Sequence, residues 1–154
     1  MATYWNHPKV PSYGFKYTED HELHRIERWA HGILTYRLPL EEQGQFVLIL
    51  KFTEVNWMAE GSRVFNIKIG DTYIRKGFDI LRGGHTSEVS LYIQFSFEDG
   101  VLVWKDQEIK NGLHNNQLIL IMEAVTDNPK IDGLILYRGN LKGIFFKSYK
   151  YFSH

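Results

Sequence analysis

Two short polar segments of the sequence lie outside the strand pattern and carry side chains that can form hydrogen bonds. One of them also carries a tryptophan ring, and the other has the residues of a turn. Glu54-Val55-Asn56-Trp57 follows an apolar run, and Thr126-Asp127-Asn128-Pro129 separates two later apolar runs. Trp29, which follows Glu27-Arg28, is a third candidate. A sugar presents apolar C–H faces and polar edges, so a sugar site combines exposed rings with amide or carboxylate groups. Taken singly, each Trp fits packing at the rim of a core equally well.

Support for catalysis is weaker. The sequence contains no Gly-x-Ser-x-Gly nucleophile motif, no phosphate-binding loop and no dinucleotide fingerprint. Glycoside hydrolysis needs two carboxyl groups at a fixed separation across a cleft, and the sequence pairs none of its candidates. We therefore predict that the chain is not an enzyme and uses no cofactor. The carboxyl candidates are Glu41-Glu42, Glu54, Glu98-Asp99 and Asp127.

The histidines form one loose cluster. His21 and His24 are three positions apart, with His31 nearby and acidic residues around them. Metal sites of known type place such ligands on defined turns or helices, and this segment shows neither. We therefore interpret it as a polar surface segment and predict no metal site. The absence of cysteine excludes disulfides and thiolate chemistry.

Bulk composition favours one domain with an apolar core. The chain has 154 residues, of which 44% are hydrophobic. Its 18 basic and 18 acidic residues balance, which argues against nucleic acid or an anionic membrane as a partner. The start carries no signal-peptide pattern, and the longest apolar run, Phe46–Leu50, is too short to cross a bilayer. The default expectation is a cytoplasmic protein.

Alternating apolar residues predict a series of short strands. Residues 1 to about 24 are polar and irregular, whereas later segments alternate with a period of two. The run 46–53 is apolar on both faces, which is typical of a central strand covered twice. Gly70-Asp71 and Asp99-Gly100 are two-residue hairpin turns. The predicted strands are 33–38, 46–53, 64–69, 72–74, 89–97, 101–104, 117–124 and 133–137.

No segment shows a capped helical period, so the pattern predicts an all-β, antiparallel β-sandwich. The last stretch, 143–152, carries five aromatic residues and two lysines. One interpretation is a final strand packed on the sandwich. The other is an aromatic tail that docks on a protein partner; contact with single-stranded nucleic acid is disfavoured by the neutral total charge.

Several of these segments together resemble the malectin family. Glu27-Arg28-Trp29 and the run from Gly44 to Trp57 look like a Glu-Arg-aromatic segment and the strand that follows it in that family. The order and spacing agree over about residues 12–138, which makes 1–154 a single malectin-like domain with an aromatic tail at 139–154. The further matching segments are Arg63–Gly70, Phe78–Ile80, Gly84–Thr86 and Asp127–Lys130.

This resemblance implies a jelly-roll-like lectin fold and a set of sugar-contacting residues. Founding members of the family bind glucose disaccharide units of N-glycans, and related domains occur in plant receptor kinases and attached to kinesins. Asn56 stands where the family has Tyr, so one stacking ring is replaced by an amide. The positions implied to bind the ligand are Tyr13, Trp29, Asn56, Trp57 and Asp127.

Two functional hypotheses follow. The first is a non-catalytic carbohydrate-binding module for a glucose-containing oligosaccharide. The second is a protein-interaction subunit of a cytoskeletal or kinesin-type assembly that keeps the fold without the sugar. The second rests on Asn56, on the lack of a signal peptide and on a short N-terminus, which we expect to leave a sheet edge uncovered for the 143–152 tail or another chain.

Overall fold

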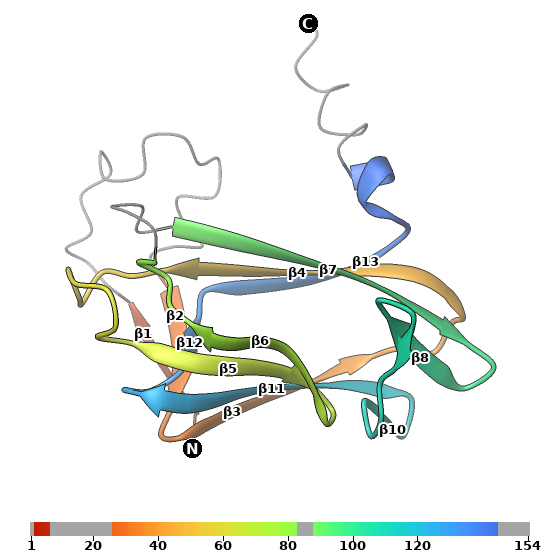
Figure 1. Ribbon diagram of the computed structural model, residues 1–154, viewed down its shortest axis with the longest axis horizontal. Coiled ribbons are helices and arrows are strands. Elements are labelled where there is room, and N and C mark those ends of the chain that lie inside the picture. The colour runs from red at the N-terminus through yellow and green to blue at the C-terminus, as the bar shows by residue number, and fades with distance from the viewer. Residues whose placement is uncertain (1, 7–25, 83–87, 145–154) are drawn as a thin grey trace, which may run out of the picture.

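The computed structural model describes residues 2–6, 26–82 and 88–144 of the chain. Two five-stranded antiparallel sheets face each other and enclose the core, and a three-stranded sheet lies at one end of this sandwich, at the left of Figure 1. The predicted all-β sandwich is therefore confirmed.

The strands of each sheet come from distant parts of the chain. One large sheet runs β10 (Leu113–His114), β11 (Gln117–Thr126), β5 (Val64–Ile69), β6 (Thr72–Phe78), with β3 (Ile33–Pro39) also paired to β11. The other runs β13 (Gly133–Arg138), β4 (Gly44–Thr53), β7 (Glu88–Glu98), β8 (Val101–Trp104), β9 (Gln107–Glu108). The small sheet runs β1 (Ala2–Asn6), β2 (Ile26–Ala30), β12 (Lys130–Ile131).

The alternation seen in the sequence sets which side chains enter the core. In β5, Phe65, Ile67 and Ile69 are fully buried while the residues between them are partly exposed. In β7, Ile93 and Phe95 point inward and Tyr92 beside them is 43% exposed. A shift by one residue would reverse every one of these side chains, so burial of one face fixes the register of the strands.

β4 is the central strand that the sequence predicted. It pairs with β13 on one side and with β7 on the other. Leu48 and Leu50 belong to the core between the sheets, whereas Val47 and Ile49 are buried on the opposite face, at 0% and 8% exposure. Both faces of this strand are therefore covered, which explains its unbroken apolar run.

Both predicted hairpin turns are present. Asp99 and Gly100 have φ angles of 49° and 78°, as a type I′ turn requires, and Glu98 pairs with Val101 across it. At Gly70-Asp71 the flanking residues Ile69 and Thr72 pair directly, as expected of a two-residue connection.

The structure differs from the sequence predictions at the N-terminal segment and contains elements that the sequence did not predict. The first residues are not irregular throughout, because Ala2–Asn6 forms β1 against β2. The small sheet also adds β12, and this pairing over about 100 residues leaves no local signal. Gly143, which one of the two interpretations placed in a final strand, belongs to one helical turn at 141–144. The rest of the aromatic stretch, 145–152, lies outside the described residues.

Candidate functional site

A buried ion pair lies beneath the segment that carries Trp57. Glu54 follows the last residue of β4 and Arg63 precedes the first residue of β5. Arg63 Nε donates to Glu54 Oε2 at 2.7 Å, and the two side chains are 9% and 1% exposed. Charges this well buried are stable in a protein only when they are paired and hydrogen-bonded, so the pair joins the ends of the two strands firmly.

The second oxygen of Glu54 shapes the turn above it. Glu54 Oε1 accepts hydrogen bonds from the backbone amides of Asn56, at 2.9 Å, and of Trp57, at 3.3 Å. A carboxylate can fix a tight turn in this way because it satisfies amides that the turn leaves without a backbone partner. The side chains of Asn56 and Trp57 are consequently held on the exposed surface, where Trp57 is 43% exposed.

The indole of Trp57 is held by Asp127, which is distant in sequence. Trp57 Nε1 donates to Asp127 Oδ2 at 2.8 Å. The same oxygen lies 3.4 Å from Arg63 Nη2, and the Asp127 side chain is 29% exposed. One guanidinium therefore contacts both the buried Glu54 and the partly exposed Asp127, and these contacts give the indole a defined orientation at the surface.

The Asp127 loop is anchored from both sides. Asp127 has a φ angle of 60°, a left-handed conformation that Asp and Asn adopt more readily than other non-glycine residues. Arg63 Nη1 donates to the carbonyl of Asn128 at 2.7 Å, and the Asn128 side chain accepts from the Gly32 amide at 3.4 Å. Lys130, 1% exposed, follows in β12. The Asp-Asn-Pro-Lys loop thus depends on contacts with two other segments.

Asp127 titrates below its ordinary range. Partial burial alone would raise its pKa, but the hydrogen bonds from the Asn128 backbone amide and the Trp57 indole and the charge of Arg63 outweigh that effect and lower the pKa from 3.8. A carboxyl group whose pKa is lower in the folded state stabilises the fold above the unfolded pKa, and this contribution disappears as the pH falls through the folded pKa.

We therefore expect the stability advantage of the wild type over Asp127→Asn to shrink on acidification. Asn retains the tolerance for the left-handed conformation but cannot ionise. Urea midpoints of both proteins, measured from about pH 7 down to about pH 2, would show the difference closing below about pH 5. A difference that stays constant over this range would contradict the role given to the Asp127 charge.

The structure brings together only part of the predicted ligand set. Trp57 and Asp127 are in contact, and Asn56 is adjacent to Trp57. Trp29 lies on β2 and pairs with Lys130, which follows Asp127 by three positions. The Trp29 ring packs edge-on against His31, with 4.9 Å between the ring centroids. Among the described residues, no hydrogen bond or ring contact joins Trp29 to Trp57 or Asp127. Tyr13 lies outside those residues.

Sequence reasoning missed the two residues that organise this surface. Glu54 was considered only as a hydrolytic carboxyl group or as part of the polar segment before Trp57, and Arg63 only as part of a strand motif. A usable signal was present, since both charges directly flank apolar strands that end at the same side of a sandwich. A charge at such a boundary is either solvated or paired, and only the three-dimensional arrangement distinguishes the two.

Neither metal binding nor membrane insertion gains support from the described ranges. Within residues 26–82 and 88–144, no three His, Asp or Glu side chains gather as they would around a metal ion. His21 and His24 lie outside the description. In the same part of the chain, no helix has the length and hydropathy needed to span a bilayer.

The fold and this surface define a β-sandwich domain that presents an oriented indole and a carboxylate from strand-end loops. A family model described as Malectin domain matches residues 3–134. The chain belongs to the malectin family, as its motifs indicated.

Known malectins show the same relationship. Malectin from Danio rerio is 28% identical over 128 residues, which cover 82% of this chain and 44% of that protein. Malectin from Homo sapiens is 28% identical over 127 residues, covering 82% of this chain and 43% of that protein. The chain therefore spans less than half the length of these relatives.

Solved structures support the fold. The extracellular domain of ANXUR2 from Arabidopsis thaliana superposes with a TM-score of 0.58 at 16% identity, covering 89% of this chain and 37% of that one. A calcium-binding mutant of Bacteroides uniformis β-glucuronidase 2 gives a TM-score of 0.54 at 14% identity, covering 82% of this chain and 13% of the enzyme. At such identities the similarity concerns the fold and not the function.

Proposed function

We propose that the chain is a non-catalytic carbohydrate-binding module that recognises a glucose-containing oligosaccharide at Trp57 and Asp127. Membership of the malectin family supports this proposal. The observation that carries it is the contact between the Trp57 indole nitrogen and Asp127 Oδ2, at 2.8 Å, on a residue that remains 43% exposed. An exposed indole beside a carboxylate supplies both kinds of contact that a sugar ring needs.

The arrangement favours binding because it is already ordered. The Trp57 indole nitrogen donates to Asp127, and the Trp57 backbone amide donates to Glu54 Oε1. Little side-chain freedom therefore remains to be lost when a ligand stacks on the indole. A carboxylate offers about four acceptor positions. The Trp57 indole and the Asn128 amide donate to Asp127 and Arg63 forms an ion pair with it, which leaves acceptor capacity for a sugar hydroxyl.

Two further residues extend the proposed surface. Trp29 offers a second ring on β2. It pairs with Lys130, the residue at the end of the Asp127 loop. Asn56 offers hydrogen bonds but no stacking face, so we expect its amide to contact hydroxyl groups at the edge of the sugar. Tyr13 completes the proposed ligand set from outside the described residues.

The same contacts argue against hydrolysis at this surface. Glu54 is 3% exposed, and its two oxygens are occupied by Arg63 and by two backbone amides. The pKa of Asp127 is lowered, whereas the acid of a glycosidase needs a raised one. Neither carboxyl group is therefore suited to donate a proton to a glycosidic oxygen, and we propose a binding role.

The direct test is calorimetric titration with maltose and nigerose. We expect millimolar or tighter binding by the wild type and a loss of at least about tenfold in Trp57→Ala, because the stacking face disappears. Asn56→Tyr adds a ring next to Trp57 and is expected to tighten binding several-fold, about 1 kcal/mol.

Tyr92→Ala is the matched control for these titrations. Tyr92 is also 43% exposed, but it lies within β7, opposite Ile49 of β4, and not in the loops that carry Trp57 and Asp127. Its removal should leave sugar affinity unchanged. If neither disaccharide binds at about 10 mM, or if Tyr92→Ala weakens binding as much as Trp57→Ala, the proposed site is wrong.

The expected cytoplasmic location and the kinesin or cytoskeletal partner stay predictions. The described residues contain no feature that selects a kinesin over any other protein.

A further inference from the structure

Among the strands that the structure describes, the side of the sandwich between β6 and β7 has two open sheet edges. β8 pairs with β7 only at Ser96–Glu98, so among the described strands the earlier part of β7 has a partner only in β4. β6 likewise pairs with β5 alone among those strands. Open edges are the places where an extended peptide can add to a sheet.

The backbone of β7 presents hydrogen-bonding groups at this edge. Because Asp99-Gly100 is a two-residue turn, Glu98 and Val101 exchange hydrogen bonds, and alternate residues of β7 point to the same side. Beyond the end of β8, the amide and carbonyl groups of Ser90 and Gln94 consequently face the open edge. A strand added there would continue the position of β8 in the sheet.

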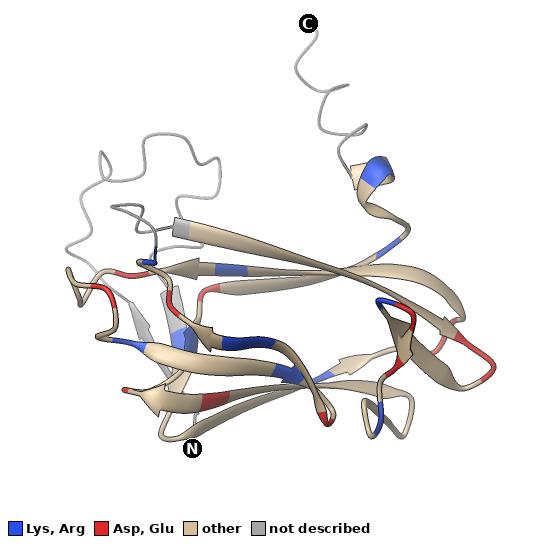
Figure 2. Cartoon of the chain, viewed as in Figure 1, with Lys and Arg blue, Asp and Glu red and all other residues tan. Residues whose placement is uncertain are grey.

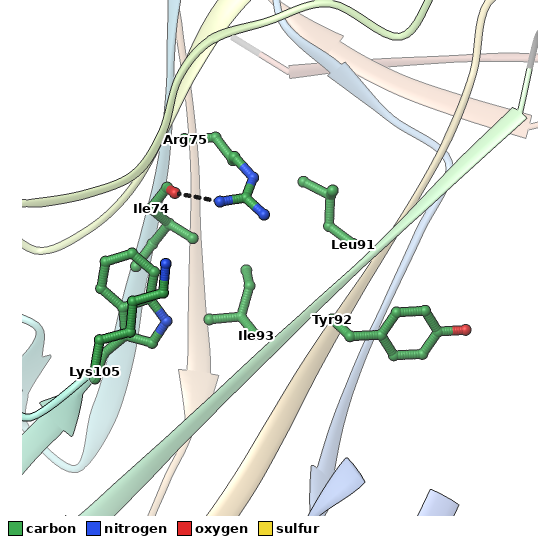
Figure 3. A pocket seen from close by; sticks show the side chains of 7 residues that line it. Ile74, Arg75, Leu91, Tyr92, Ile93 and Lys105 are labelled. Atoms are coloured by element: carbon green, nitrogen blue, oxygen red, sulfur yellow. Dashed lines mark hydrogen bonds between the residues drawn. The ribbon is translucent and has the colours of Figure 1, made fainter. Parts of the chain in front are cut away.

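A small pocket lies between the two edges. Its volume is about 60 Å³, and Figure 3 shows Arg75, Leu91 and Ile93 directed toward it while Tyr92 points away. Sites for free small molecules usually measure about 300–1,000 Å³, so this pocket is too small for a sugar ring. It suits a single aliphatic side chain. The lining residues are Ile74, Arg75, Leu91, Tyr92, Ile93, Trp104 and Lys105.

Two cations beside the pocket have no acidic partner in the described part of the chain. Arg75 donates only to the carbonyl of Ile74, at 3.4 Å, and Lys105 lies over the Trp104 ring at 4.6 Å. Both side chains are exposed. Some other cations of the same sheets are paired with acids, since Lys68 pairs with Glu123 and Arg138 pairs with Glu42. The basic segment of β6 is visible in Figure 2.

We propose that this side binds an extended acidic peptide segment as an additional strand on β7. Side chains two positions apart in a strand lie on the same face. An aliphatic side chain of the peptide enters the pocket, and an acidic side chain two residues away pairs with Arg75 or Lys105. The β7 edge supplies the backbone hydrogen bonds, and the cations select acidic sequences. This site is separate from Trp57 and Asp127 and independent of sugar binding.

The test uses a labelled peptide, acetyl-Glu-Thr-Val-Thr-Glu-Thr-amide, in fluorescence anisotropy. We expect binding that weakens with salt and that falls by at least about tenfold when Arg75→Glu and Lys105→Glu are combined. Arg37→Glu, which reverses an exposed cation on β3, is the matched control and should leave affinity unchanged. Saturating maltose and Trp57→Ala should also have no effect on the peptide.

Three results would overturn the proposal. The first is no binding of the acidic peptide at about 1 mM, or equal binding of its Lys-Thr-Val-Thr-Lys-Thr counterpart. The second uses two N-methylated versions of the peptide, each methylated on the amides along one of its two edges. Strand addition requires the amides of one edge, so one version must fail to bind. Full binding of both versions would exclude strand addition. The third is displacement of the peptide by millimolar glucuronate, which would make this an acidic-sugar site.

Discussion

Replacing Arg63 with methionine is expected to lower the free energy of unfolding by about 3–5 kcal/mol, because it leaves the Glu54 carboxylate buried without its partner. Glu54 is 3% exposed, and water cannot replace the guanidinium that bonds to it at 2.7 Å. The same change removes the contacts from Arg63 to Asp127 and to the Asn128 carbonyl, so the Asp127 loop should loosen as well.

Urea unfolding of Arg63→Met beside Arg138→Met would measure this effect. Arg138 pairs with Glu42 on the surface, with the two side chains 62% and 68% exposed, and exposed pairs contribute about 0–1 kcal/mol. The double variant Glu54→Met, Arg63→Met should recover part of the loss, since it removes both charges together. Equal losses in Arg63→Met and Arg138→Met would show that the buried pair is not what joins the strand ends.

The buried pair also links fold stability to the proposed binding surface. Glu54 orders the turn that carries Trp57, Arg63 joins that turn to the Asp127 loop, and Asp127 orients the indole. Two segments that are far apart in sequence, 54–63 and 127–128, therefore meet at one guanidinium. A binding surface supported by such a network gains rigidity from the core, because each exposed residue contacts a residue that is itself fixed.

Sequence patterns predicted the parts of this fold that depend on local chemistry. Strict alternation in β5 and β7 placed their apolar faces correctly, and Asp99-Gly100 identified its hairpin. The small sheet was missed because β2 pairs with Lys130 and Ile131, about a hundred positions away, and only tertiary packing brings these segments together. Ala2–Asn6 carries no alternation strong enough to indicate a strand on its own.

The candidate site shows the same division. The family motifs indicated Asn56, Trp57 and Asp127 as candidates, but the contact between Trp57 and Asp127 is supported by Arg63, whose role no spacing rule reveals. The pocket beside Arg75 left no trace in the sequence either, because it results from the early end of the β7–β8 pairing. Buried charges and open edges both depend on which strands become neighbours.

Gly70→Ala is expected to destabilise the fold by about 3 kcal/mol, through two separate effects. Gly70 has a φ angle of 54°, where any side chain is strained. A Cβ atom there would also lie 2.3 Å from the carbonyl oxygen of Lys110 and 2.4 Å from the nitrogen of Gly112. These are backbone atoms, held by the hydrogen bond from the Asp71 amide to the Lys110 carbonyl at 2.9 Å, and they cannot move aside cheaply.

Gly100→Ala separates the two effects. Gly100 also occupies a hairpin turn with a positive φ, of 78°, but a Cβ atom at this position would meet nothing within 4 Å beyond its chain neighbours. Only backbone strain remains, so the loss should be about 1 kcal/mol. Chemical unfolding of both variants would test this order. Equal losses would mean that the backbone at 110–112 moves to accommodate the Cβ atom at position 70. The close contacts around Gly70 would then add nothing to the backbone strain that both turns share.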